Sequence, residues 1–235
     1  MVVCSLLLGA VLSGEWQNLI EKDNFQHWRS PSGKTDVGGA WSIRNGVLTT
    51  KPYVHRRTDL WSAEEYSDFE LEWQWKPRKG ANSGVKYWVQ TAVNLVIEEE
   101  DKKFRRITDV AEAKPDETLT EFSLGLEYQM ADDEFEPVSI QRKDSRSGGL
   151  YSLFAPQPEA VKKHGKWNHS RLLVRGGHVE HWLNGKKTLE YDRAKLAEQM
   201  KKTPLRYVIE RERGPIALQY HQTVVSFRKM RIRRL

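Results

Sequence analysis

Cysteine is almost absent from the sequence, since Cys4 is the single one among 235 residues. One thiol excludes an internal disulfide framework and any zinc site built from several cysteines. The fold must therefore be stabilised by packing, for which the chain holds a large supply of aromatic side chains: 9 Trp, 8 Tyr and 7 Phe. Length and composition are typical of one globular domain with a full hydrophobic core.

The motifs of several common enzyme classes are missing as well. The sequence has no glycine-rich phosphate loop, no Gly-x-Ser-x-Gly turn and no His-Glu-x-x-His motif. Their absence argues against nucleotide-dependent and serine-hydrolase chemistry. We therefore expect no nucleotide cofactor.

Long hydrophobic runs are missing too, so we expect no stable membrane span. Residues 2–12 are almost wholly apolar, have the length of a signal-peptide h-region and precede the small residues Ser13 and Gly14. No basic residues come before this run, so a buried strand is the alternative interpretation. We expect residues 1–14 to be a signal-peptide remnant and residues 15–235 to form a single domain.

Neither sign of charge dominates the chain, because 38 Lys and Arg residues are interleaved with 32 Asp and Glu residues, for a net charge of +6. This balance favours no nucleic-acid partner. The basic segment 228–234 alternates with Met230 and Ile232, which is typical of an edge strand with one solvated face. Nothing in the sequence indicates an oligomeric state.

Hydrophobic periodicity indicates an all-β fold. From Trp41 onward, apolar residues recur with a period of two between closely spaced turn signals, which is typical of a sandwich. Asn-Gly pairs at 45–46 and 184–185 each separate two short segments and predict tight hairpins. The predicted strands are 41–44, 47–48, 68–76, 85–90, 122–130, 171–175, 179–183, 187–191, 216–221 and 224–232.

Two segments break this rhythm. Residues 92–120 carry clusters of charge with little periodicity, so we expect a long inserted loop that could hold a helical turn. Residues 194–201 predict a short helix. No repeat or linker divides the chain.

Strand alternation groups polar residues that one concave sheet face could share. It places residues of one strand on one face, but it does not tell which strands are neighbours. For Glu70, Glu72 and Gln74, an ordinary solvated face is the favoured interpretation. The candidates are Glu70, Glu72, Gln74, Lys86, Trp88, Glu127, Gln129, Gln219 and His221.

Glu127 and Gln129 stand out because their strand is otherwise apolar and leads into Asp132 and Asp133. A carboxylate beside amides and a histidine can act as a general base or bind a hard divalent cation. A structural salt bridge to an arginine explains the same pattern equally well.

Two histidines occupy different strand faces. His221 shares the side of Gln219, opposite an apolar trio, and should face the polar concavity, although such a histidine is more commonly a satisfied surface imidazole. His181 shares the parity of Val179 and Leu183, which favours a buried, hydrogen-bonded histidine.

Aromatic residues suggest a sugar ligand. Trp and Tyr rings on a sheet face pack against the apolar faces of sugar rings, while carboxylates and amides bind the hydroxyl groups. Most of the nine tryptophans must belong to the core. We expect Tyr87, Trp88 and Tyr151 to lie nearest a ligand.

Ten segments in order resemble one known family. They are Trp41–Leu48, Asp59–Trp61, Tyr66–Leu71, Gly80–Tyr87, Gly125–Met130, Gly149–Tyr151, Gly165–Arg171, His178–Gly185, Ile216–His221 and Val225–Arg233. Together they resemble the 3-keto-disaccharide hydrolase family, glycoside-hydrolase-like proteins, over about residues 15–235.

The resemblance implies an all-β, concanavalin-A-like jelly-roll sandwich of two antiparallel sheets, exported from bacteria to the periplasm or the medium. It also implies cleavage of 3-keto-glycosides, including 3-keto-disaccharides. A ketone at carbon 3 acidifies the proton on carbon 2, so a base can remove it and the glycosidic oxygen can leave from carbon 1. Such a reaction needs a base, a donor to the enolate oxygen and a proton source.

Matched to the family's pattern, three residues receive catalytic roles. His221 is expected to be the general base or acid, Glu127 a base or metal ligand, and Lys86 the stabiliser of the enolate. Glu127 and His221 are also the tentative ligands of a divalent metal, with Ca, Mn and Zn not distinguished. The expected substrate-binding residues are Gln129, Gln219, Trp88, Tyr151, His181, Glu70 and Glu72.

The chain departs from the family pattern at three places. Tyr220 stands where an Asp commonly precedes the last histidine, residues 94–119 form an insertion, and Gln222 and Thr223 replace a glycine-rich turn. Two other functions remain open: a non-catalytic carbohydrate-binding module on the same fold, and a retaining glycosidase that would use Glu70 and Glu72.

Overall fold

The structure is a computed structural model that describes residues 14–98, 103–202, 209 and 211–235. The predicted signal-peptide remnant, residues 1–14, therefore lies almost wholly outside the described residues. Among the helices of the described part, none is both long and apolar enough to cross a bilayer.

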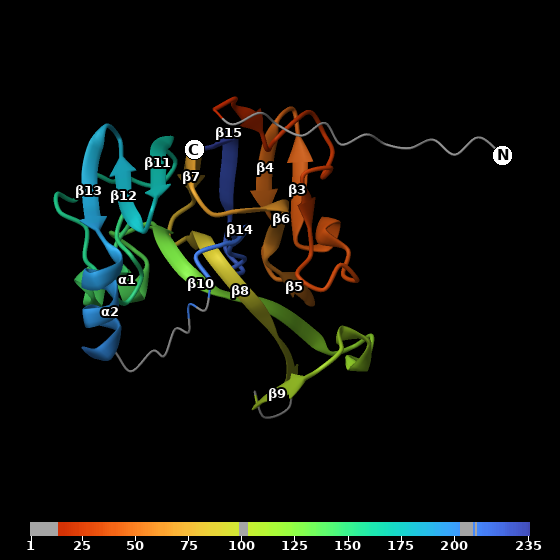
Figure 1. Ribbon diagram of the computed structural model, residues 1–235. Coiled ribbons are helices and arrows are strands. Elements are labelled where there is room, and N and C mark those ends of the chain that lie inside the picture. Colours follow the sequence, from red (N-terminus) through yellow and green to blue (C-terminus); the bar gives the residue numbers. More distant parts are fainter. Residues whose placement is uncertain (1–13, 99–102, 203–208, 210) are drawn as a thin grey trace.

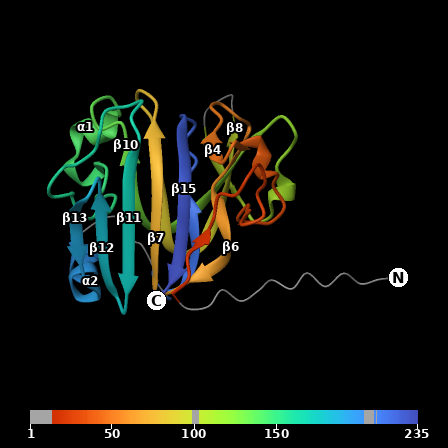
Figure 2. The same cartoon turned by 90° about the horizontal axis from the view of Figure 1, so that it is seen from above.

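Two sheets pack face to face around one core (Figure 1). In the described residues the eight-stranded sheet has the order β13-β12-β11-β7-β15-β4-β3, with β1 paired to β15. Figure 2 looks onto this sheet, with β13, β12, β11, β7 and β15 side by side. Its strands are β1 (Gln17–Asn18), β3 (Trp41–Arg44), β4 (Val47–Thr50), β7 (Phe69–Pro77), β11 (Asn168–Arg175), β12 (His178–Leu183), β13 (Lys186–Tyr191) and β15 (Val225–Arg234).

The seven-stranded sheet lies behind it with the order β2-β6-β14-β8-β10-β5, and β9 is paired to β8. All described strand pairs are antiparallel except the short β5–β10 pair. The all-β, jelly-roll sandwich expected from the sequence is thereby confirmed. Its strands are β2 (Trp28–Arg29), β5 (Arg56–Thr58), β6 (Leu60–Tyr66), β8 (Asn82–Glu98), β9 (Lys103–Ile107), β10 (Thr118–Ala131) and β14 (Gly214–Leu218).

Strand alternation builds the core as the sequence predicts. On β7, every second residue is fully buried between the sheets, from Phe69 through Trp73 to Trp75. Trp73 contacts the opposite sheet, because its ring lies 5.0 Å from that of Tyr128 and its Nε1 donates to the sulfur of Met130. Burial of such aromatic side chains is the main source of the sandwich's stability.

Both predicted Asn-Gly hairpins are present. Asn45 and Gly46 join β3 to β4, and Asn184 and Gly185 join β12 to β13, with positive φ at all four residues. Positive φ at both central positions is what a tight hairpin turn with right-handed strand twist requires. The predicted helix is present as α2 (Arg193–Lys202). Short helices complete the described elements: η1 (Val37–Gly39), η2 (Val110–Glu112), α1 (Pro137–Gln141) and η3 (Lys143–Ser145).

The expected loop at 92–120 is wrong for its described part, which consists largely of strands. Figure 1 shows β8 and β10 continuing beyond the sandwich as an arm that ends at β9; we define the arm as residues 92–98 and 103–123. Val96, Ile107 and Leu119 give it a small apolar cluster of its own. Because β9 is mostly exposed and rich in charge, its sequence carries no period-two apolar signal.

The expectation that Trp88 shares a face with Lys86 is also wrong. The register of β8 against β10 shifts between Tyr87 and Thr91, and Trp88 has a φ of 48°. This bulge turns Trp88 toward the core beside Tyr87, with ring centroids 5.9 Å apart and Trp88 only 2% exposed. A bulge re-aims side chains without leaving a clear trace in the hydrophobic pattern.

Candidate functional site

Four predicted site residues meet on the outer face of the seven-stranded sheet, the face turned away from the core. The register pairs Glu127 with Lys86 and Lys86 with Ala217, so adjacent strands present these side chains in one row. Gln129 lies opposite Gly84, whose carbonyl accepts the backbone N–H of Gln219. The alternation that buries Leu126, Tyr128 and Leu218 is what turns their polar neighbours outward.

The carboxyl group of Glu127 lies directly over Gly84. A side-chain Cβ at position 84 would be 2.4 Å from Glu127 Oε1, so this position of the carboxyl group requires glycine. Gln219 Nε2 donates to Glu127 Oε2 at 3.1 Å, and Glu127 is only 5% exposed. Sheet register and one amide thus hold this carboxyl group in a single orientation.

Lys86 is the residue of β8 opposite Glu127 and is 1% exposed. Its Nζ is 3.2 Å from Asp59 Oδ2, donates to the carbonyl of Ser123 at 3.1 Å, and is 3.9 Å from Glu127 Oε2. The sequence predicts a lysine that contacts the substrate, whereas this ammonium group is enclosed by protein. Its geometry suits an effect on Glu127 better than direct contact with a ligand.

Two carboxyl groups share this one buried ammonium group. Burial raises the pKa of Glu127 to about 7, and the charge of Asp59 raises it too, while Lys86 opposes them. Asp59 is closer to Lys86 than Glu127 is, so the charge of Lys86 is largely compensated before it reaches Glu127. Glu127 is therefore a carboxyl group that exchanges its proton near neutral pH.

Asp59 is the residue that reasoning from the sequence missed. It is 2% exposed and lies between β5 and β6, where its Oδ2 also accepts the N–H of Ser123 and its Oδ1 that of Tyr220. One carboxylate thus joins β10, Lys86 and the end of β14. The segment Asp59–Trp61 carried the family resemblance, and that was its only signal in the sequence.

His221 follows β14 at the rim of this cluster and is exposed. The predicted strand 216–221 ends at Leu218 because Tyr220 donates to Asp59 instead of to a neighbouring strand. Partial desolvation of its ring lowers the pKa of His221, against the opposite effect of Glu136. Its imidazole is therefore mostly neutral near pH 7 and can accept a proton.

Two amide oxygens beside Glu127 have no hydrogen-bond partner in the described part of the chain. Gln129 donates through Nε2 to Asn82 Oδ1 at 3.2 Å, which leaves Gln129 Oε1 buried and unpaired. Gln219 Oε1 is likewise buried and unpaired. Because an unsatisfied buried acceptor is costly, these oxygens indicate where the hydroxyl groups of a ligand would donate.

Glu127 and His221 do not fit the divalent-metal site that the sequence suggested. An ammonium group lies 3.9 Å from Glu127 Oε2, and Gln219 Nε2 donates to the same oxygen. Both contacts disfavour a divalent cation there, because they place a positive charge and a hydrogen-bond donor at the atom that would bind it.

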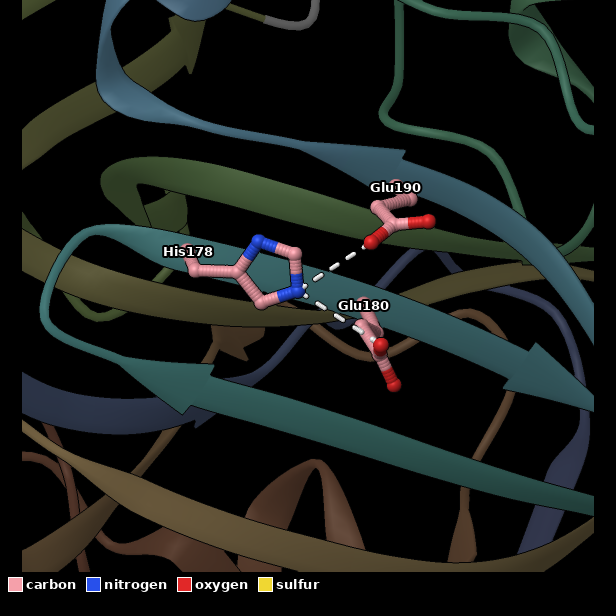
Figure 3. Close-up of side chains that lie close together, drawn as sticks. All are labelled: His178, Glu180 and Glu190. Carbon is pink, nitrogen blue, oxygen red and sulfur yellow. Dashed lines mark hydrogen bonds and ion pairs between the residues drawn. The ribbon is translucent and has the colours of Figure 1, made fainter.

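A different trio of potential ligands lies on the outer face of the eight-stranded sheet. His178 Nε2 is 3.5 Å from Glu180 Oε1 and 3.4 Å from Glu190 Oε1, and in the described residues no other group of three His, Asp or Glu side chains converges this closely (Figure 3). Lys187 Nζ lies 3.4 Å from Glu180 and 2.6 Å from Glu190. The lysine already supplies the counter-charge, so we interpret the group as an ion-pair network.

Glu70 and Glu72 are not brought to the Glu127 cluster. They lie on β7 in the other sheet, and their side chains face outward. Glu70 is paired with Arg171 and Arg233, and Glu72 Oε2 lies 2.7 Å from Arg231. The paired-carboxylate glycosidase therefore has no support from this face, because arginines bind both groups.

The remaining predicted ligand-binding residues occupy two environments. His181 is fully buried in the core, where its Nε2 is 3.0 Å from the hydroxyl of Tyr87, and burial lowers its pKa to about 3. Tyr151 lies next to the cluster strand, since its N–H donates to the carbonyl of Glu127. The structure thus brings Tyr151 to the site and separates His181 and Trp88 from it.

Comparisons with known proteins relate this chain to one family. The model of the family described as "3-keto-alpha-glucoside-1,2-lyase-like domain" matches residues 15–233. A protein of Bacteroides thetaiotaomicron named 3-keto-disaccharide hydrolase is 28% identical over 92% of this chain and 77% of its own length.

Two solved structures from Parabacteroides distasonis, each described as a glycosyl hydrolase, have the same fold. One is 26% identical, with a TM-score of 0.72 over 94% of both chains. The other is also 26% identical, with a TM-score of 0.63 over 94% of this chain and all of that one.

Proposed function

We propose that this chain, which belongs to the family of 3-keto-alpha-glucoside-1,2-lyase-like domains, cleaves glycosides whose glucose unit carries a ketone at carbon 3. The observation that carries the proposal is Glu127, a buried carboxyl group that exchanges its proton near neutral pH. The exposed imidazole of His221 follows β14, a strand of the same sheet. The name of the Bacteroides thetaiotaomicron relative supports the substrate class.

The reaction begins with proton removal. Neutral His221 takes the proton from carbon 2, and the electron pair of that C–H bond moves into the enolate of the 3-ketone. The enolate then expels the glycosidic oxygen from carbon 1 and forms a double bond between carbons 1 and 2. The departing oxygen keeps the electron pair of the broken bond and needs a proton. Protonated Glu127 supplies it, as a general acid whose pKa is near the working pH.

Water completes a net hydrolysis. Glu127, now a carboxylate, takes a proton from the water as its hydroxide adds to carbon 1. Protonated His221, which exchanges its proton with solvent, gives a proton to carbon 2. These steps give the free 3-keto-sugar and restore both residues.

Lys86 acts through Glu127, because its ammonium group is held between Asp59 and that carboxyl group. The unpaired oxygens of Gln129 and Gln219 accept substrate hydroxyl groups.

The test compares a methyl 3-keto-glucoside with its unoxidised parent, with and without a chelator. We expect release from the keto compound alone, and persistence of that release with the chelator because the proposed proton transfers use only His221 and Glu127. In heavy water, elimination followed by addition places deuterium on carbon 2 of the product, whereas direct hydrolysis does not. The product incubated without enzyme controls for spontaneous exchange. Binding without any cleavage would instead support the carbohydrate-binding module.

We also infer that the protein is exported to the periplasm or the medium. The apolar residues 2–12, which have the length of a signal-peptide h-region, support this location. Fractionation of the producing cells tests it, and recovery of the uncleaved chain in the cytoplasm would contradict it.

A further inference from the structure

Phe122 is an exposed aromatic side chain next to the buried charges of the site. It lies on β10 where the arm leaves the sandwich, and 37% of it is exposed. Its neighbours Glu121 and Ser123 are at most 1% exposed. Phe122 is therefore a large aromatic side chain that keeps part of its surface open to solvent beside buried polar groups.

The orientation of this ring is fixed by Lys86. The ammonium nitrogen lies 3.6 Å from the centroid of the Phe122 ring. An approach this close is possible only over the face of a ring, since the ring's own edge atoms block a nearer approach in its plane. One face of Phe122 therefore covers Lys86, and the exposed area belongs to the opposite face and the edges.

The ring also lies close to the proposed acid. The same ammonium nitrogen is 3.9 Å from Glu127 Oε2, so one charged group separates the Phe122 ring from the carboxyl group. The group that Glu127 protonates is the oxygen of the bond to the leaving group. A leaving group that extends from Glu127 past Lys86 would meet the open face of Phe122.

We propose that Phe122 is a specificity-determining residue whose open face packs against the leaving group of the substrate. This assignment rests on the proposed function. The matching chemistry is a leaving group with a flat apolar face, which is a second sugar ring or an aromatic ring. A small alkyl leaving group offers no such face and gains nothing from Phe122.

The test measures kcat and KM for three substrates: a 3-keto-disaccharide, an aryl 3-keto-glucoside and a methyl 3-keto-glucoside. Phe122→Leu keeps an apolar cover over Lys86 but removes the flat face. We expect it to raise KM for the first two substrates about tenfold, which is ~1.4 kcal/mol, and to leave kcat and the methyl compound unchanged. Phe122→Tyr keeps the flat ring and should have the wild-type kcat and KM for all three substrates.

Phe104→Leu is the matched control. Phe104 is 66% exposed on β9, at the far end of the arm, and should have no effect on any substrate. Equal losses for all three substrates would mean that Phe122 only shields Lys86, and this would overturn the proposal. An unchanged KM for both large substrates would overturn it as well. A response of only one large substrate identifies which kind of ring the face accepts.

A failure of the proposed function is distinguishable from a failure of this inference. If the wild-type protein cleaves no 3-keto-glycoside, the affinities of unoxidised aryl and methyl glucosides are measured by calorimetry. The inference then requires tighter binding of the aryl compound and loss of this preference in Phe122→Leu. Equal affinities in the wild type, or no binding, would overturn it.

Discussion

The two outer faces of the sandwich hold carboxylates beside cations, yet they differ in the number of counter-charges. On the eight-stranded sheet, Glu70 has two arginines; burial raises its pKa, but hydrogen bonds from Arg171 and Arg233 outweigh this and lower it. On the seven-stranded sheet, Glu127 shares one lysine with Asp59, and burial raises its pKa to about 7. Two cations for one carboxylate keep Glu70 ionised in an ion-pair network. One cation for two carboxylates leaves Glu127 able to exchange a proton near neutral pH.

The largest expected difference between the faces is in turnover. Glu127→Gln keeps the shape of the side chain but cannot donate the carboxyl proton, so we expect kcat for a 3-keto-glucoside to fall by about 10²–10⁴-fold. Glu70→Gln is the matched control on the other face and should leave kcat within about twofold. Release of the leaving group measures both. Full turnover in Glu127→Gln would remove Glu127 from the mechanism.

The next difference is in stability. Lys86→Met leaves Asp59 buried without its cation, and we expect the free energy of unfolding to fall by about 3–5 kcal/mol. Arg231→Met breaks a half-exposed pair with Glu72 and should cost less than about 1 kcal/mol. Urea unfolding at pH 7 measures both variants. Similar losses in the two variants would show that burial of the Lys86 pair has no special energetic role.

The pH dependence of stability should have opposite signs on the two faces. Above pH 4.5, Glu127 ionises in the unfolded chain but keeps its proton in the folded protein, so rising pH lowers the free energy of unfolding until about pH 7. The loss is about 3 kcal/mol, and Glu127→Gln should abolish it. For Glu70, whose pKa is lowered, stability is present above the unfolded pKa and is lost as the pH falls through the folded one.

Urea unfolding of the wild type and both Gln variants from about pH 2.5 to about pH 8 checks these signs, because the range then reaches the acid region in which Glu70 titrates in the folded protein. Relative to the wild type, Glu127→Gln should become more stable as the pH rises toward 7. Relative to the wild type, Glu70→Gln should become less stable as the pH rises through the acid range. Parallel curves for the three proteins would contradict the different electrostatics of the two faces.

The sequence predicts which residues of one strand share a face, but it does not predict which strands belong to the same sheet. The Asn-Gly hairpins and the alternation of β7 are short-range signals. They correctly predicted the hairpin strands and which residues of β7 face the core. Glu70 and Glu127 carry the same alternating signal, however, and only the strand order assigns them to different sheets. Sheet order depends on contacts between residues far apart in the sequence, which a single sequence does not reveal.

Two other features had little or no local signal. Trp88 turns inward because of a bulge, and tryptophan is not a residue that marks positive φ. Asp59 lies in a connection between strands and acts through partners 27, 64 and 161 residues away. Glu127 and Gln129 stand in a recognisable alternating pattern, whereas the partners of Asp59 depend on the completed fold.

The smallest expected effect concerns metal ions on the eight-stranded sheet. His178, Glu180 and Glu190 converge as ligands of a metal would (Figure 3). Lys187 contacts both carboxylates, and Arg171 Nη1 lies 3.8 Å from Glu180. We expect manganese, zinc or a chelator to leave the thermal midpoint of the wild-type protein unchanged. Lys187→Met should instead produce a metal-dependent rise, because no ammonium group then competes with a metal ion for both carboxylates. A metal-dependent rise in the wild type would show that Lys187 does not exclude a metal from this cluster. The number of counter-charges would then not explain the difference that we propose between the two faces.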